Sequence, residues 1–156
     1  MKTLLSMLLL LAFLMSGCAT TTYSVGSKGP AGGIIFYDDE ADGTDHIPGE
    51  RFLEAAPEDL PGFYTWGIQG DMLPDLDGYQ LGTGEHATQV LIQQYPDGNY
   101  AANACASYTL GEYDDWFLPS QSAMKLMFSE LKLKGIGNFK NDSYLTSGED
   151  DPTSVE

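Results

Sequence analysis

Apolar residues occur in short runs separated by long polar, glycine-rich segments. Three runs contain residues typical of strands: residues 33–38 and 63–68 are rich in β-branched or aromatic residues, and residues 51–57 are apolar around Phe52 and Leu53. Each is predicted to form a β-strand. Since successive side chains of a strand point to opposite faces, Phe52 and Leu53 are expected on different faces of the second one.

Helical periodicity begins only in the second half of the chain. Apolar residues at helical spacing predict a first helix over residues 85–95, with Thr83 placed to cap its N-terminus. Residues 100–108 predict a short, alanine-rich helix, and residues 121–134 predict a third. A few strands followed by short helices and long loops predict an α+β domain.

The third helix carries the clearest local signals. Ser120 precedes it and is predicted to cap it, while Gly135 follows it and is predicted to end it. One face is predicted to pack in the core because it presents an apolar stripe, consisting of Met124, Met127, Phe128 and Leu131.

The N-terminus has the pattern of an export signal. Lys2 precedes an apolar run over residues 4–15, which is shorter than the ~20 residues that span a bilayer. Ser16 and Gly17 then stand directly before Cys18, which resembles a bacterial lipobox. This pattern predicts a signal peptide over residues 1–17 and a lipid-anchored Cys18. The alternative is an ordinary secretory signal that is cleaved near Ala19.

This interpretation sets the expected organisation and location. Residues 18–32, rich in small residues and glycine, are predicted to be a tether, and residues 33–156 the domain. The residue after Cys18 is Ala19 rather than Asp, which favours the outer membrane of a two-membrane bacterium. The membrane partner is then the lipid anchor, and the domain faces the periplasm or the cell surface.

The chain is strongly acidic. It has 23 Asp and Glu against 7 Lys and Arg, which gives a formal net charge of −16. Nucleic acids and anionic lipid surfaces repel such a protein, so a nucleic-acid partner is excluded. The acidity serves either solubility or the recognition of a cation, and solubility is the simpler interpretation.

The two cysteines support neither a disulfide nor a zinc site. If Cys18 is lipidated, Cys105 has no partner within the chain. Cys105 lies among alanines at helical spacing and is predicted to be a small buried residue, with a reactive thiol as the alternative. Neither His46 nor His86 has a Cys or His nearby in sequence, so zinc has almost no support.

The stretch "GEYDDWFLPS" places two acids beside an aromatic residue. A glycosidase needs two carboxyl groups converging on one bond, about 5–9 Å apart. Asp114 and Asp115 are adjacent on a predicted extended strand, so their side chains diverge. A catalytic pair is therefore not expected. One of the two is expected to accept a hydrogen bond at the turn, and Pro119 is expected to end the strand.

Two other groups are candidate binding residues. Asp38, Glu40 and Asp42, followed by Gly43, match the first half of an EF-hand-like calcium loop, and Asp45 adds an oxygen. The second half of the motif does not match, so a solvated acidic turn is the alternative. Separately, three aromatic residues are candidates for stacking on sugar rings, although cores use such residues too: Trp66, Tyr64 and Tyr79.

Five segments occur in an order that resembles the DUF1566 family, which includes the C-terminal domain of a Legionella collagen-like adhesin. They are "GPAGGIIFYD", "RFLEAAPEDLPG", "LGTGEHATQVLI", "AANACASYTLGEYDDWFLPSQSAMKLMFSEL" and "NDSYLTSGE". The resemblance covers about residues 25–149. It implies an exported or lipid-anchored protein with a C-type-lectin-like fold, and no catalytic residues are carried over.

The chain departs from the family pattern in two ways. The usual Tyr-Trp-Ser-Ser block appears as Tyr144, Leu145, Thr146 and Ser147. The family also continues for several more strands, so residues 33–156 are expected to be an incomplete domain whose late strands are missing.

The resemblance and the lipobox together predict a function. We expect a non-enzymatic, lipid-anchored envelope protein that recognises a polysaccharide or an envelope protein, as in adhesion. A structural envelope lipoprotein without a soluble ligand is the alternative, as is a non-functional fragment. An enzyme of the formylglycine-generating type would need reactive, usually paired cysteines, and only Cys105 is available.

Overall fold

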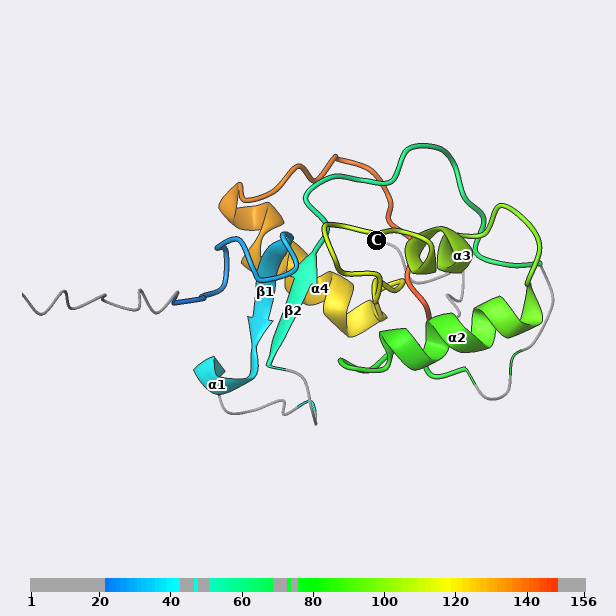
Figure 1. The fold of residues 1–156 in the computed structure, drawn as a ribbon, viewed down its shortest axis with the longest axis horizontal. Helices are drawn as coiled ribbons and strands as arrows, with labels where there is room; N and C mark the ends of the chain where they lie inside the picture. Colours follow the sequence, from blue (N-terminus) through cyan, green and yellow to red (C-terminus); the bar gives the residue numbers. More distant parts are fainter. Residues whose placement is uncertain (1–21, 43–46, 48–50, 69–72, 74–75, 149–156) are drawn as a thin grey trace, which may run out of the picture.

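A computed structural model describes residues 22–42, 47, 51–68, 73 and 76–148. Figure 1 shows a small sheet backed by one helix, with further helices beside it and long loops between them. This arrangement confirms the α+β class. The elements in chain order are β1 (Ile34–Asp38), α1 (Asp39–Asp42), β2 (Phe52–Ala55), α2 (Gly84–Gln94), α3 (Ala101–Ala106), α4 (Gln121–Glu130) and the 3-10 helix η1 (Lys132–Lys134).

β1 and β2 pair in antiparallel fashion, which confirms the first two predicted strands. The register places Ile35 opposite Glu54 and Tyr37 opposite Leu53, so Phe36 is the extra residue of a bulge. A bulge interrupts the alternation of side chains between the two faces. Ile35, Phe36 and Tyr37 are therefore all buried although they are consecutive in sequence.

The predicted strand over residues 63–68 is wrong. Its only ladder contact among the described residues is a single parallel bridge between Thr65 and Tyr100. Phe63 is 94% exposed, and Gly67 packs closely against the ring of Tyr95. A strand needs a neighbour along its length, and an aromatic sequence alone does not supply one.

Two helices agree with the sequence to within one or two residues, but the predicted Thr83 cap is wrong. The Thr83 side chain makes no capping bond, and its hydroxyl instead donates to the carbonyl of Gln80 at 2.9 Å. The Ser120 cap is confirmed, because its Oγ accepts from the amide of Ala123 at 3.2 Å. Gly135 ends η1 with a φ of 71°, in the left-handed region that favours glycine.

The third predicted helix is divided into α4 and η1, and its buried face differs from the predicted stripe. Ala123, Met127 and Leu131 are buried and recur every four residues along one line. Phe128 lies about 100° around the helix from Met127 and is 47% exposed, so its predicted burial is wrong. The Lys132 ammonium lies 5.7 Å from the centre of the Phe128 ring.

The buried apolar residues form two clusters. The first cluster joins the sheet to α4 and contains Phe36, Tyr37, Leu53, Ala55, Ala123, Met127 and Leu131. The second cluster lies between α2, α3 and the loops beside them, and it contains Leu73, Leu91, Tyr95, Ala101, Ala102 and Leu118.

Residues 116–119 connect the two clusters. Phe117 packs against the first cluster, while Leu118 belongs to the second. The amide of Leu118 donates to Thr88 Oγ1 on α2 at 3.0 Å, and the carbonyl of Pro119 accepts from the amide of Ser147 at 2.8 Å. No strand forms here among the described residues, so the predicted strand before Pro119 is wrong. Its backbone groups bond to α2 and to the C-terminal segment instead.

Part of the predicted tether packs on the sheet. The amide of Gly26 donates to the carbonyl of Ile35 at 2.8 Å, and the amide of Ile35 donates to Ser27 at 3.0 Å. Tyr23 meets the ring of Phe52 edge to face, with centroids 5.4 Å apart. Residues 22–32 therefore contribute to the fold on the outer side of β1.

Candidate binding cleft

The described residues form an open cleft of about 990 Å³. Residues of β2, α3 and α4 line it, together with the segments 58–64, 113–119 and 139–145. The cleft therefore lies where both hydrophobic clusters meet the surface. A volume of this size matches that of ordinary ligand sites.

Two aromatic rings form a corner in the cleft wall. Tyr108 and Trp116 meet edge to face, with centroids 5.3 Å apart and ring planes at 73°. Trp116 also lies close to Gly33, where an added Cβ would be 3.0 Å from Cη2 of the indole. The indole Nε1 is buried and has no hydrogen-bond partner in the described part of the chain.

The predicted sugar-stacking residues are not brought together. Tyr64 lines the cleft, and its hydroxyl donates to the carbonyl of Pro61 at 2.8 Å. Trp66 packs against the second cluster and donates from Nε1 to the carbonyl of Thr146 at 3.0 Å. Neither Trp66 nor Tyr79 is among the cleft-lining residues.

Sequence reasoning missed the corner of Tyr108 and Trp116. One signal was present, because Gly111 lies between the two rings and predicts a turn that can bring them together. In the structure Gly111 has a φ of 64°, and Leu110 forms a bridge with Tyr113 across that turn.

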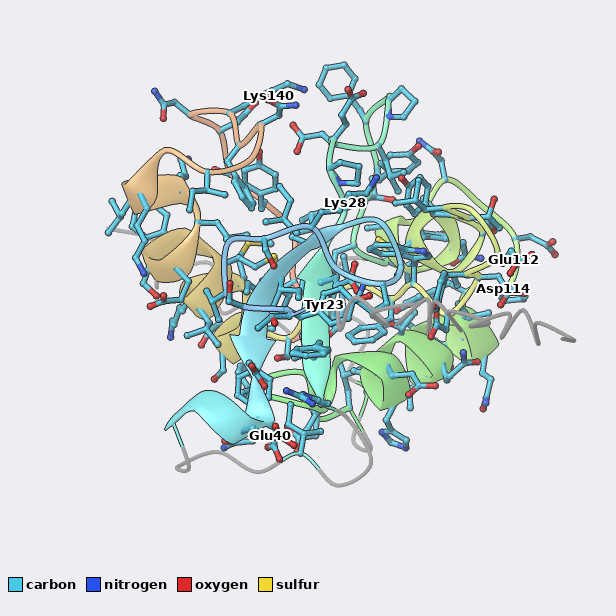
Figure 2. All side chains as sticks on the ribbon, turned by 60° about the vertical axis from the view of Figure 1, so that its left-hand side comes forward. Tyr23, Lys28, Glu40, Glu112, Asp114 and Lys140 are labelled. Atoms are coloured by element: carbon cyan, nitrogen blue, oxygen red, sulfur yellow. The ribbon has the colours of Figure 1, made fainter. Side chains whose placement is uncertain are left out.

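An acidic loop borders the cleft beside this corner. Glu112, Asp114 and Asp115 are exposed, and Asp115 lines the cleft. Figure 2 shows Glu112 and Asp114 close together on the outside of the loop. Among the described residues none of the three makes an ion pair or a hydrogen bond. The expectation that one of the two aspartates would bond to the turn is therefore wrong, and the loop remains uncompensated negative charge.

The segment 139–145 is fastened across the chain to Asp59. The Lys140 ammonium lies 3.0 Å from Asp59 Oδ2, and the Tyr144 hydroxyl donates to Asp59 Oδ1 at 3.1 Å. The amide of Lys140 in turn donates to the Tyr144 hydroxyl at 2.8 Å. The hydrogen bond that the Lys140 ammonium donates to Asp59 raises the pKa of Lys140, and burial raises the pKa of Tyr144. Lys140, labelled in Figure 2, therefore has its charge compensated by Asp59.

Half of the proposed calcium ligands can be placed. Asp38 Oδ1 accepts from the amide of Glu40 at 3.2 Å and lies 3.7 Å from Arg51 Nε. Glu40 Oε2 lies 2.9 Å from the same guanidinium. The side chain of Asp42 and the whole of Asp45 fall outside the described residues. Within the described residues no group of three metal-ligating side chains occurs. Arg51 therefore occupies the space between the two placed carboxylates, and calcium stays a prediction.

Replacing Arg51 with glutamine tests both the ion pairs of Arg51 and the predicted calcium site. We expect the free energy of unfolding to fall by about 1 kcal/mol or less. Asp38 is nearly buried and loses a partner, but Arg51 is half exposed, so solvent weakens the ion pair. If the loop binds calcium, removal of the competing cation strengthens the binding. Millimolar calcium then raises the melting temperature of the variant more than that of the unmodified protein. Equal melting temperatures with and without calcium in both proteins would contradict the calcium prediction.

Cys105 is a partly buried residue packed against the second cluster. Burial raises its pKa from the ordinary value of 9.0 to about 11. The raised pKa favours the thiol over the reactive thiolate. This placement agrees with the interpretation of Cys105 as a small buried residue.

The raised pKa predicts slow alkylation of Cys105. A rise of the pKa from 9.0 to about 11 lowers the thiolate fraction at pH 8 about 100-fold, so iodoacetamide should react about 100-fold more slowly than in denaturant. Because the folded-state pKa is the higher one, the neutral thiol stabilises the fold below pH 9, and this contribution is lost between pH 9 and about 11. Rates measured in a Cys18→Ser background isolate Cys105. Similar rates in buffer and denaturant would contradict the prediction.

No helix among the described residues combines the length and apolar character needed to span a bilayer. Comparisons with family models, with curated proteins and with solved structures found no match to this chain.

Proposed function

We propose that this protein is a lipid-anchored cell-envelope protein whose domain binds a polysaccharide or an envelope protein without catalysing a reaction. The observation that carries the proposal is the open, aromatic-lined cleft of about 990 Å³. The lipobox-like sequence before Cys18 supports the anchor. The motif resemblance supports a C-type-lectin-like fold, and Ala19 after Cys18 supports outer-membrane delivery, with the domain exposed to the periplasm or the cell surface.

Carboxylates in the cleft wall support binding more than chemistry, because two of them are already bonded to other parts of the chain. Glu54 accepts from the amides of Ala31 and Gly33 at 3.0 and 2.9 Å, and so fixes the turn before β1. Asp59 is engaged by Tyr144 and Lys140. These bonds pre-organise the walls of the cleft, which lowers the entropy lost on binding.

A matched pair of tyrosines tests the cleft. Tyr113 lines it and is 39% exposed, whereas Tyr79 is 43% exposed and does not line it. We expect Tyr113→Ala to weaken binding to solubilised envelope components at least about 10-fold, since a contact worth 1.4 kcal/mol corresponds to a factor of ten. Tyr79→Ala should bind like the unmodified protein. Unchanged binding by Tyr113→Ala would overturn the assignment of the cleft.

The anchor is tested separately. Metabolic labelling with palmitate should mark the full-length protein and should be lost in Cys18→Ala, while Cys105→Ala should be labelled normally. Labelling that persists in Cys18→Ala would contradict the lipid anchor. A labelled protein that binds no envelope component would instead support the structural lipoprotein without a soluble ligand.

A further inference from the structure

β2 has an edge with unpaired backbone groups. The amide of Asp39 donates to the carbonyl of Arg51 at 2.8 Å, so Arg51 faces β1. In an antiparallel pair, backbone groups face the partner at alternate residues, so those of Phe52 and Glu54 face away from β1. The opposite strand agrees, because Ile35, the partner of Glu54, directs its amide and carbonyl to residues 26–27.

This edge lies in the cleft. All four residues of β2 are among the cleft-lining residues. The other side of the sheet is covered, since residues 26–28 pair with β1. Among the described residues the backbone groups of Phe52 and Glu54 have no hydrogen-bond partner. A two-stranded sheet with one open edge is a ready template for a further strand.

The charges of the cleft specify what kind of strand fits. Two cations of the lining are already paired, Arg51 with Glu40 and Lys140 with Asp59. Three carboxylates of the lining make neither an ion pair nor a hydrogen bond among the described residues: Glu58, Glu85 and Asp115. The exposed acids beside Asp115 add to the negative potential there. A bound strand that carries Lys or Arg would compensate these charges.

We infer that the β2 edge binds an extended segment of a partner protein that carries lysine or arginine side chains. The inference rests on the proposed function and names its ligand. Main-chain groups of the segment pair with Phe52 and Glu54, and its basic side chains face the free carboxylates.

Other occupants fit the charges less well. A second copy of the chain brings a further −16 charge to the same acidic cleft. A neutral glycan leaves the three carboxylates uncompensated and has no regular row of amide groups to pair with a strand edge. The basic polypeptide satisfies both the backbone edge and the charge.

Three synthetic peptides test the inference on the full-length anchored protein in detergent. The probe is a dye-labelled, end-capped octapeptide of alternating lysine and threonine. One control replaces lysine with glutamate, and the other keeps lysine but methylates alternate backbone amides. Fluorescence polarisation should show binding of the probe and at least about 10-fold weaker binding of both controls. Equal binding of the methylated peptide would show attraction by charge alone and would overturn strand addition.

Two exposed aspartates serve as a matched pair of protein variants. Asp115→Lys changes the cleft, and Asp97→Lys makes the same charge change on the turn after α2, away from the lining. The first should weaken probe binding at least about 5-fold more than the second. Equal effects, or a dimer that forms in place of peptide binding, would overturn the inference. If the probe fails but envelope components still bind, only the inference fails. If neither binds, the proposed function fails too.

Discussion

Replacing Leu131 with alanine should lower the free energy of unfolding by about 2–5 kcal/mol. Leu131 has no exposed surface and belongs to the first cluster, where α4 packs on the sheet. Its amide also donates to the carbonyl of Met127 at 2.9 Å, so the residue lies at the junction of α4 and η1. Truncation leaves a cavity at that junction, because the sheet is held in place by its turns and bulge and cannot collapse onto the helix.

Leu133→Ala is the matched control. The same residue type lies two positions further along, in η1, where it is 69% exposed. Its truncation removes little buried surface and should change the free energy of unfolding by about 0.5 kcal/mol or less. Urea unfolding followed by tryptophan fluorescence, with hydrogen exchange of the α4 amides, compares the two variants. Equal effects would contradict the assignment of Leu131 to the core.

Replacing Gly78 with alanine is the second large change. An added Cβ would lie 2.2–2.4 Å from backbone atoms of Ser147 and Gly148, which is closer than real contacts allow. The carbonyl of Gly78 also accepts from the amide of Gln121 at 2.8 Å, at the first turn of α4. Relieving the clash must therefore move the C-terminal segment or the start of α4. We expect the free energy of unfolding of Gly78→Ala to fall by about 1–3 kcal/mol.

The position of the C-terminal segment provides a second readout. Trp66 Nε1 bonds to the carbonyl of Thr146, so displacement of this segment should increase amide exchange at Ser147 and shift the tryptophan emission. Gly111→Ala is the control. Its added Cβ has open space, and its positive φ alone costs about 1 kcal/mol. Exchange at Ser147 that is unchanged in Gly78→Ala would contradict the close approach.

The segment before α4 was predicted only in part. The cap at Ser120 could be predicted because it depends on neighbouring residues, whereas the strand predicted before Pro119 is wrong because a strand needs a partner from elsewhere in the chain. The sequence did not show that Phe117 joins the first cluster and Leu118 the second. Nor did it show that the acids before them stay unpaired, because this depends on which distant cations lie nearby.

The environments of the two tryptophans also depend on distant contacts. Both stand in short aromatic segments, and of the two only Trp66 was predicted to bind a ligand. The structure places Trp116 in the cleft wall and packs Trp66 against the second cluster, where it bonds to Thr146. Contacts between residues eighty positions apart produce this exchange of environments, and no local pattern encodes them.

The sequence by itself determined the positions of β1, β2, α2, α3 and α4, the Ser120 cap and the Gly135 stop, because periodicity and capping act within a few residues. Only the tertiary structure decided that residues 63–68 remain unpaired, that Arg51 joins Asp38 and Glu40, and that the free edge of β2 lies in an aromatic cleft. Each of these features depends on which distant segments meet. These tertiary contacts result from the packing of whole helices and strands, and no short stretch of sequence specifies them.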